Sequence, residues 1–263
     1  MEWQTNDLHD LKTAVDLLEN PGLIAKVSDV VGTPIEYFLN KLPQGAGDKI
    51  TRVTHSSLMA AVNMAVKTMN PGDQRKPRSR SHVAIAGLAG GVGGAFGLVA
   101  LPIELPITTT VIMRSIADIA RSEGEDLWNV ESRLACLEVF AMGGPSEADD
   151  AAESGYFAVR TALAQAVSEA AKYVAKRAVM EDGAPVIVRL LAQIAARFNT
   201  VVGEKIMAQG VPIVGALGGA TINVLFIEHF QDMARGHFIV RRLERKYGED
   251  EVRKTYGEIL GNQ

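Results

Sequence analysis

The fold of this chain is decided by one stretch, residues 83–113, which reads VAIAGLAGGVGGAFGLVALPIELPITTTVIM. A second stretch, residues 206–227, reads IMAQGVPIVGALGGATINVLFI and carries no charge. Glycines four residues apart in both stretches make a flat groove on a helix, where another backbone can approach closely. Each interior glycine costs about 0.5–1 kcal/mol of helix stability relative to alanine. So many glycines together predict a tightly packed central pair of glycine-rich apolar helices.

The rest of the chain favours an all-α protein. Apolar residues recur at helical spacing in residues 50–69, 186–207 and 229–247, and an Ala-rich helical pattern runs from a cap at Ser146 to residue 180. No run alternates as a β-strand would. Because only 6% of the residues are aromatic, the core is expected to consist mainly of Ala, Val, Leu and Ile. We predict a single multi-helix domain over residues 1–263.

Composition argues against several classes of protein. The formal net charge of −4 disfavours a nucleic-acid partner, because a general nucleic-acid binder carries a broad basic surface. A single cysteine, Cys136, excludes an internal disulfide and offers no cysteine cluster for a metal. The first residues are acidic and polar and lack the pattern of a signal peptide, which predicts a cytoplasmic protein.

Residues 83–103 carry no charge and are long enough for a membrane span, which needs about 20 residues. Glu104 follows at once, between Pro102 and Pro106, and a carboxylate facing lipid there would be costly. We therefore rank buried central helices first, a hairpin that dips into the membrane second, and a transmembrane span third.

Basic residues lie beside both apolar stretches. A linker at about residues 70–82 precedes the first stretch and a basic amphipathic helix follows the second; their cations are Arg75, Lys76, Arg78 and Arg80, and Arg241, Arg242, Arg245 and Lys246. Each basic residue near an anionic membrane adds about 1 kcal/mol of binding. Both clusters are predicted to contact anionic lipid or an acidic membrane-protein partner. The alternative for the linker is an ordinary solvated loop.

Polar residues in apolar surroundings are the candidates for chemistry. The residues of this kind are Glu104, Arg114, Lys205 and Asn223. They point to no reaction, and we favour a buried network of ion pairs and hydrogen bonds that fixes the register of the helices.

A metal site is the alternative interpretation of the same region. Glu228 and Asp232 are four residues apart and His229 and Asp232 three apart, so they can share one helix face. With Glu104 they could form a carboxylate and imidazole site for a divalent metal. His237 is too far along the helix to join His229 on one metal unless the helix breaks near Gly236. The chain has no HExxH, CxxC or GxSxG motif.

Three segments resemble the EcsC family of bacterial proteins: NPGLIAKVSDVVGTPIEYFLNKLP at 20–43, ELPITTTVIMRSIADIARSEGEDL at 104–127, and VPIVGALGGATINVLFIEHFQDMARGHFIVRRLERKYG at 211–248. The resemblance covers about residues 20–248. The residues that fall where the family pattern expects them are Glu104, Pro106, Arg114, Lys205, Pro212, Gly215, Asn223, His229 and His237. It implies a cytoplasmic, membrane-peripheral protein of a family named for its association with an ABC-transporter operon, and it implies no established activity.

We expect a non-enzymatic accessory factor at the inner face of the membrane. Its partner would be membrane lipid, an apolar ligand such as an acyl chain, or a membrane protein such as a transporter, and no cofactor is expected for that role. The alternative is a metal-dependent, peptidase-like hydrolase that uses the carboxylate and histidine site.

Overall fold

The computed structural model describes residues 3–19, 23, 46–67, 101–143, 155–177, 184–209 and 219–262. These residues form helices and turns, with no strand among them, which confirms the all-α prediction. In chain order the described helices are α1 (Thr5–Glu19), α3 (Ala46–Lys67), α5 (Leu101–Ser122), α6 (Val130–Glu138), the 3-10 helix η3 (Val139–Ala141), α7 (Gly155–Arg177), α8 (Pro185–Gln209), α10 (Gly219–Tyr247) and α11 (Glu249–Leu260).

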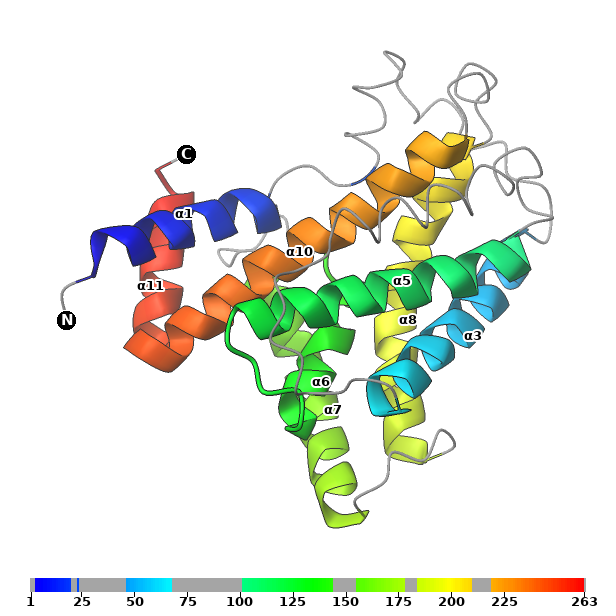
Figure 1. Cartoon of the computed structure of the whole chain (residues 1–263), viewed down its shortest axis with the longest axis horizontal. Coiled ribbons are helices and arrows are strands. Elements are labelled where there is room, and N and C mark those ends of the chain that lie inside the picture. The colour runs from blue at the N-terminus through cyan, green and yellow to red at the C-terminus, as the bar shows by residue number, and fades with distance from the viewer. Residues whose placement is uncertain are drawn as a thin grey trace.

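The longest of these helices, α10, has 29 residues and runs through the middle of the described structure (Figure 1). α1 and α5 pack along α10, and α11 folds back from its C-terminal end. α3 packs against α5 and α8, and α7 lies against α6 and α8. α5 begins inside the first apolar stretch and α10 inside the second, so the two stretches contribute helices that pack on each other in the core. The glycine-rich residues 83–100 and 210–218 lie outside the described residues.

Four phenylalanines occupy the place where α8, α10 and η3 meet. Phe140, Phe198, Phe226 and Phe230 are all fully buried. The ring centroid of Phe230 lies 5.5, 5.4 and 5.2 Å from those of Phe140, Phe198 and Phe226. Aromatic pairs at such distances contribute about 0.5–1.5 kcal/mol each beyond the burial of their area. The residues around this aromatic centre are mainly aliphatic, as the composition predicted.

α10 is one continuous helix, whereas the sequence pattern predicted a separate helix starting at residue 229. The predicted boundary lies where the sequence changes from apolar to charged residues. This change alters the solvent exposure of the helix but does not end it. Gly236 does not break the helix either. A Cβ atom added at Gly236 would lie 2.5 Å from Cγ of Leu18. The glycine is needed there because α1 approaches the α10 backbone closely.

One described helix meets the length and composition of a membrane span, at Pro185–Ile206 of α8. Its most apolar window is 44% buried inside the protein. Phe198 and Lys205 of this helix have no exposed surface. Core helices and membrane helices share this length and apolarity, so the segment alone is weak support for a span. Here α8 packs as a core helix.

Candidate functional site

A buried ion pair joins three helices at the ends nearest the two glycine-rich stretches. Lys205 Nζ, near the end of α8, donates hydrogen bonds to Glu104 Oε1 of α5 at 2.6 Å and to Asn223 Oδ1 of α10 at 2.7 Å. Thr108 Oγ1 donates to the same Asn223 oxygen at 3.4 Å. Glu104 is 4% exposed, and Lys205 and Asn223 are not exposed at all. The structure thus brings together three of the four polar residues that the sequence singled out.

Two opposing effects act on Lys205. Burial disfavours its ammonium form and lowers the pKa, while the adjacent Glu104 carboxylate raises it; the net pKa is below the usual lysine value. The ammonium also lies 4.7 Å from the centroid of the Phe226 ring, within the range of a cation–π contact. These contacts join Lys205 of α8 to Glu104 of α5 and to Asn223 and Phe226 of α10. The ion pair therefore fixes the register of α5, α8 and α10.

Arg114 does not belong to this cluster, and the prediction that it is a buried polar residue is wrong. Its side chain is exposed on α5. Ten residues separate Glu104 from Arg114, which is about 2.8 helical turns, so the two side chains point in different directions. Of these two residues, Glu104 faces the core and Arg114 faces solvent.

The four residues of the proposed metal site do not converge. No group of three or more His, Cys, Asp or Glu side chains among the described residues is placed to hold a metal ion. Glu228 is exposed, Asp232 pairs with Arg235 at 2.9 Å, and Glu104 is bound by Lys205. Asn223 shares the Lys205 ammonium with Glu104, and it lies six residues, or about 9 Å along α10, before His229.

The basic residues at the end of α10, which the sequence predicted to contact a membrane or partner, each have an acidic partner within the protein. Arg241 binds Glu125 at 2.8 Å, and Arg245 binds the same carboxylate. Arg242 binds Asp10 at 2.6 Å, Glu123 at 2.8 Å and Asp7 at 3.3 Å, and Lys246 binds Asp7 at 2.6 Å. These acids neutralise the cations and clamp α1 and the α5–α6 turn to α10. Arg75, Lys76, Arg78 and Arg80 lie outside the described residues.

Asp7 is the centre of the clamp on α1. It is buried and accepts hydrogen bonds from Lys246, Tyr247 and Arg242. The bonds from Lys246 and Tyr247 lower the pKa of Asp7 below the usual aspartate value. A carboxyl group with a lowered pKa stabilises the fold above its unfolded pKa of about 3.9, and this contribution is lost as the pH falls through the folded value.

We therefore expect the free energy of unfolding to fall between pH 7 and about pH 3 by more in the wild type than in Asp7→Asn. The variant is expected to be the less stable of the two at pH 7, because Lys246 and Arg242 lose their anion. Urea unfolding at both pH values, followed by circular dichroism, measures the two differences. Equal losses in the two proteins would show that Asp7 contributes nothing to acid sensitivity.

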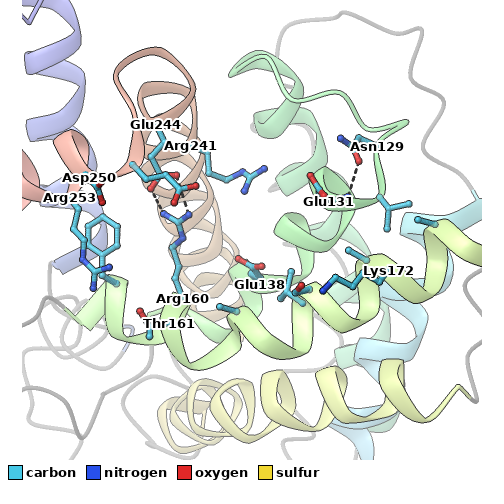
Figure 2. Close-up of a pocket in the computed structure, with 18 residues that line it drawn as sticks. Asn129, Glu131, Glu138, Arg160, Thr161, Lys172, Arg241, Glu244, Asp250 and Arg253 are labelled. Atoms are coloured by element: carbon cyan, nitrogen blue, oxygen red, sulfur yellow. Dashed lines mark hydrogen bonds and ion pairs between the residues drawn. The ribbon is translucent and has the colours of Figure 1, made fainter. Parts of the chain in front are cut away.

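A pocket of about 630 Å³ lies between α6, α7, α10 and the start of α11 (Figure 2). Arg160 of α7 and Arg241 and Glu244 of α10 line it, together with Glu138 at the end of α6. Its walls come from segments that are far apart in the sequence. Sequence reasoning identified Arg241 only as a surface cation and missed the other three.

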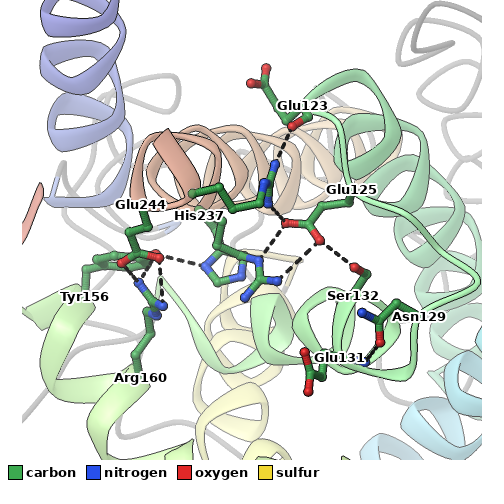
Figure 3. Close-up of polar contacts among 11 residues, drawn as sticks. Glu123, Glu125, Asn129, Glu131, Ser132, Tyr156, Arg160, His237 and Glu244 are labelled. Carbon is green, nitrogen blue, oxygen red and sulfur yellow. Dashed lines mark hydrogen bonds and ion pairs between the residues drawn. The ribbon is translucent and has the colours of Figure 1, made fainter. Parts of the chain in front are cut away.

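Two of the residues that line this pocket, Arg160 and Glu244, belong to a network of hydrogen bonds that includes buried side chains (Figure 3). Arg160 donates to both carboxylate oxygens of Glu244 at 2.6 and 3.1 Å, and to the Tyr156 hydroxyl at 3.3 Å. The Tyr156 hydroxyl also lies 3.0 Å from His237 Nδ1. Burial lowers the pKa of His237 well below the usual value, with Arg160 and Arg241 adding to the effect, so its imidazole is neutral. The polar residues 237, 241 and 244 of α10 recur at helical spacing, a signal that could have indicated the network.

Glu125 anchors the neighbouring part of the network. Ser132 Oγ donates to Glu125 Oε2 at 2.5 Å, and Arg241 donates to both oxygens at 2.8 and 3.3 Å. Burial raises the pKa of Glu125, but the hydrogen bonds from Arg241 and Ser132 outweigh it and the net pKa is lowered. Asn129 caps α6 by accepting from the Glu131 backbone N–H. The turn between α5 and α6 is thereby held against α10.

These features define a class: an all-α protein whose helices are held in register by a buried Lys–Glu–Asn cluster and by arginine–carboxylate clamps. The model of the EcsC protein family matches residues 12–243, which include the three buried residues and exclude α11. The chain belongs to the EcsC family. Comparisons with curated proteins and with solved structures give no match.

Proposed function

We propose that this protein is a non-enzymatic, membrane-peripheral factor that binds lipid through the start of α5 and the uncharged stretch before it. The observation that carries the proposal is the exposure of two isoleucines one turn apart on α5. Ile103 is 72% exposed and Ile107 is 46% exposed. Their neighbours Glu104 and Thr108 face the core and are hydrogen-bonded there. The start of α5 therefore has a polar inner side and an apolar side that faces outward.

Sequence context supports a lipid surface as the partner. Residues 83–102 before Ile103 carry no charge, and the basic linker of about residues 70–82 precedes them. Burying an aliphatic side chain fully contributes about 1.5–3 kcal/mol. Two isoleucines, with a few cations earlier in the sequence, therefore suit reversible binding better than permanent insertion.

The buried ion pair has a supporting role in this proposal. Lys205 and Glu104 are enclosed by three helices, so a substrate has no access to their charged groups. Glu104 directly follows Ile103, and its bond to Lys205 fixes the rotation of α5. We assign the pair the task of holding the apolar face outward.

Replacing both isoleucines, in Ile103→Gln/Ile107→Gln, is expected to reduce vesicle binding about tenfold or more, because two exposed aliphatic groups are lost from the contact. Flotation with phosphatidylglycerol–phosphatidylcholine vesicles at low and moderate salt measures the bound fraction. Val188→Gln is the matched control, since Val188 is an exposed aliphatic residue on α8, at 41%. Its bound fraction is expected to equal that of the wild type.

Wild-type protein that stays at the bottom of the gradient at both salt concentrations contradicts the lipid proposal. Sedimentation with native membranes but not with lipid vesicles would replace lipid by a membrane protein as the partner. Equal flotation of wild type and the double variant would show that the start of α5 is not the contact.

A further inference from the structure

The pocket between α6, α7, α10 and α11 has an apolar strip along one wall. Ala164, Val167, Ala171 and Ala175 line the pocket from α7 at intervals of three or four residues. Residues at this spacing form one stripe on a helix, and eleven residues extend about 16 Å along it. The small side chains leave room against the helix for an elongated apolar group.

A buried carboxyl group is directed into the same pocket. Glu138 is only 8% exposed, and Figure 2 shows its carboxyl group in the space between α7 and α10. Within the described parts of the chain, no hydrogen bond or ion pair engages this group. A carboxyl group that lines a pocket and has no protein partner can accept hydrogen bonds from a ligand bound there.

The charges that line the pocket, apart from its ion pairs, favour a cation. Arg160 and Arg241 are each held by two hydrogen bonds to a carboxylate, from Glu244 and Glu125. Apart from these pairs, the charged residues that line the pocket are four acids and two bases: Glu131, Glu138, Glu249 and Asp250, and Lys172 and Arg253. An anionic ligand that bound Arg160 or Arg241 would have to displace Glu244 or Glu125 from its arginine.

We propose that this pocket binds an organic cation of the alkylamine or polyamine class. The ligand's ammonium N–H groups donate to the Glu138 carboxylate, and its methylene chain lies on the apolar strip of α7. A bare divalent metal fits less well, because no three metal-ligating side chains converge among the described residues. An ammonium needs only hydrogen-bond acceptors and an apolar surface for its carbon chain.

Binding of a cation in this arrangement is linked to the ionisation of Glu138. Burial raises the pKa of Glu138, and Arg160 and Arg241 partly offset the rise. The other charged groups that line the pocket are Lys172 from α7, Glu244 from α10, Glu131 from α6, and Glu249, Asp250 and Arg253 from α11. An ammonium beside Glu138 favours its ionised form, so the affinity is expected to rise with pH until Glu138 is ionised in the free protein.

Isothermal titration calorimetry of the full chain with spermidine tests the proposal. We expect saturable binding to one site, weakened about 10- to 100-fold in Glu138→Gln, which removes one charged hydrogen-bond acceptor. Glu169→Gln is the matched control, because it removes one acid of α7 that lies outside the pocket lining. Its affinity is expected to equal that of the wild type.

A second variant, Ala171→Leu, fills the strip on a partly exposed helix face and does not alter the charge. It is expected to weaken spermidine binding while leaving the melting temperature near that of the wild type. Equal losses in Glu138→Gln and Glu169→Gln, or heat without saturation, would reduce the binding to general charge attraction and overturn the site. Tighter binding of inorganic phosphate than of spermidine would also overturn it.

Discussion

Replacing Lys205 by methionine is expected to lower the free energy of unfolding by about 3–5 kcal/mol. The loss arises because Glu104 would remain buried without its cation, and Asn223 Oδ1 would lose its strongest donor. Methionine has nearly the volume of the lysine stem, so little of the effect comes from a cavity. Urea denaturation followed by circular dichroism measures the change.

Two controls separate the buried charge from the loss of packing. Glu104→Gln combined with Lys205→Met removes both charges and is expected to recover more than half of the loss, because no uncompensated ion remains. Arg189→Met breaks an exposed ion pair with Glu169 and is expected to cost less than about 1 kcal/mol. A Lys205→Met variant as stable as Arg189→Met would contradict the buried ion pair.

Replacing Gly143 by alanine is expected to cost about 2–5 kcal/mol of stability. Gly143 has φ of +76°, where an L-residue is strained by about 1–2 kcal/mol. Its added Cβ atom would also lie 2.3 Å from His229 Nε2 and 3.1 Å from Met233 Cγ. Both are buried side chains of α10, and overpacking of this kind costs about 1–3 kcal/mol.

Gly124→Ala provides the matched control for Gly143→Ala. Gly124 has φ of +79°, but its added Cβ atom would meet only Arg245 Nη2, at 3.8 Å. The control therefore carries the backbone strain without the collision. Thermal and urea unfolding of both variants are expected to place Gly143→Ala well below Gly124→Ala. Equal stabilities would show that the turn after η3 does not approach His229 closely.

The sequence predicted the helical fold and the residues of the buried cluster, because both depend on local pattern. Glu104, Lys205 and Asn223 are conspicuous as polar residues beside long apolar runs. The same criterion failed for Arg114, since apolar neighbours in sequence do not show which side of a helix faces the core. Periodicity counted from Glu104 would have placed Arg114 off the core face.

The clamps and the pocket could not be predicted, because they depend on which helices become neighbours. Arg241 and Glu125 are separated by 116 residues, and Arg242 and Asp7 by 235. A basic cluster with such distant partners looks the same in sequence as one that faces a membrane. Glu138 gave no signal either, since an acid at the end of a short helix is usually solvated.

The clamp on α1 has a consequence for biosynthesis. Asp7 and Lys246 are separated by 239 residues, so α1 leaves the ribosome long before the helix that binds it has been translated. Until then its apolar side, with Leu11 and Leu18, has no α10 to cover it. A nascent chain of this kind is a natural client for chaperones. Folding can finish only after α10 has been translated and α1 can dock on it.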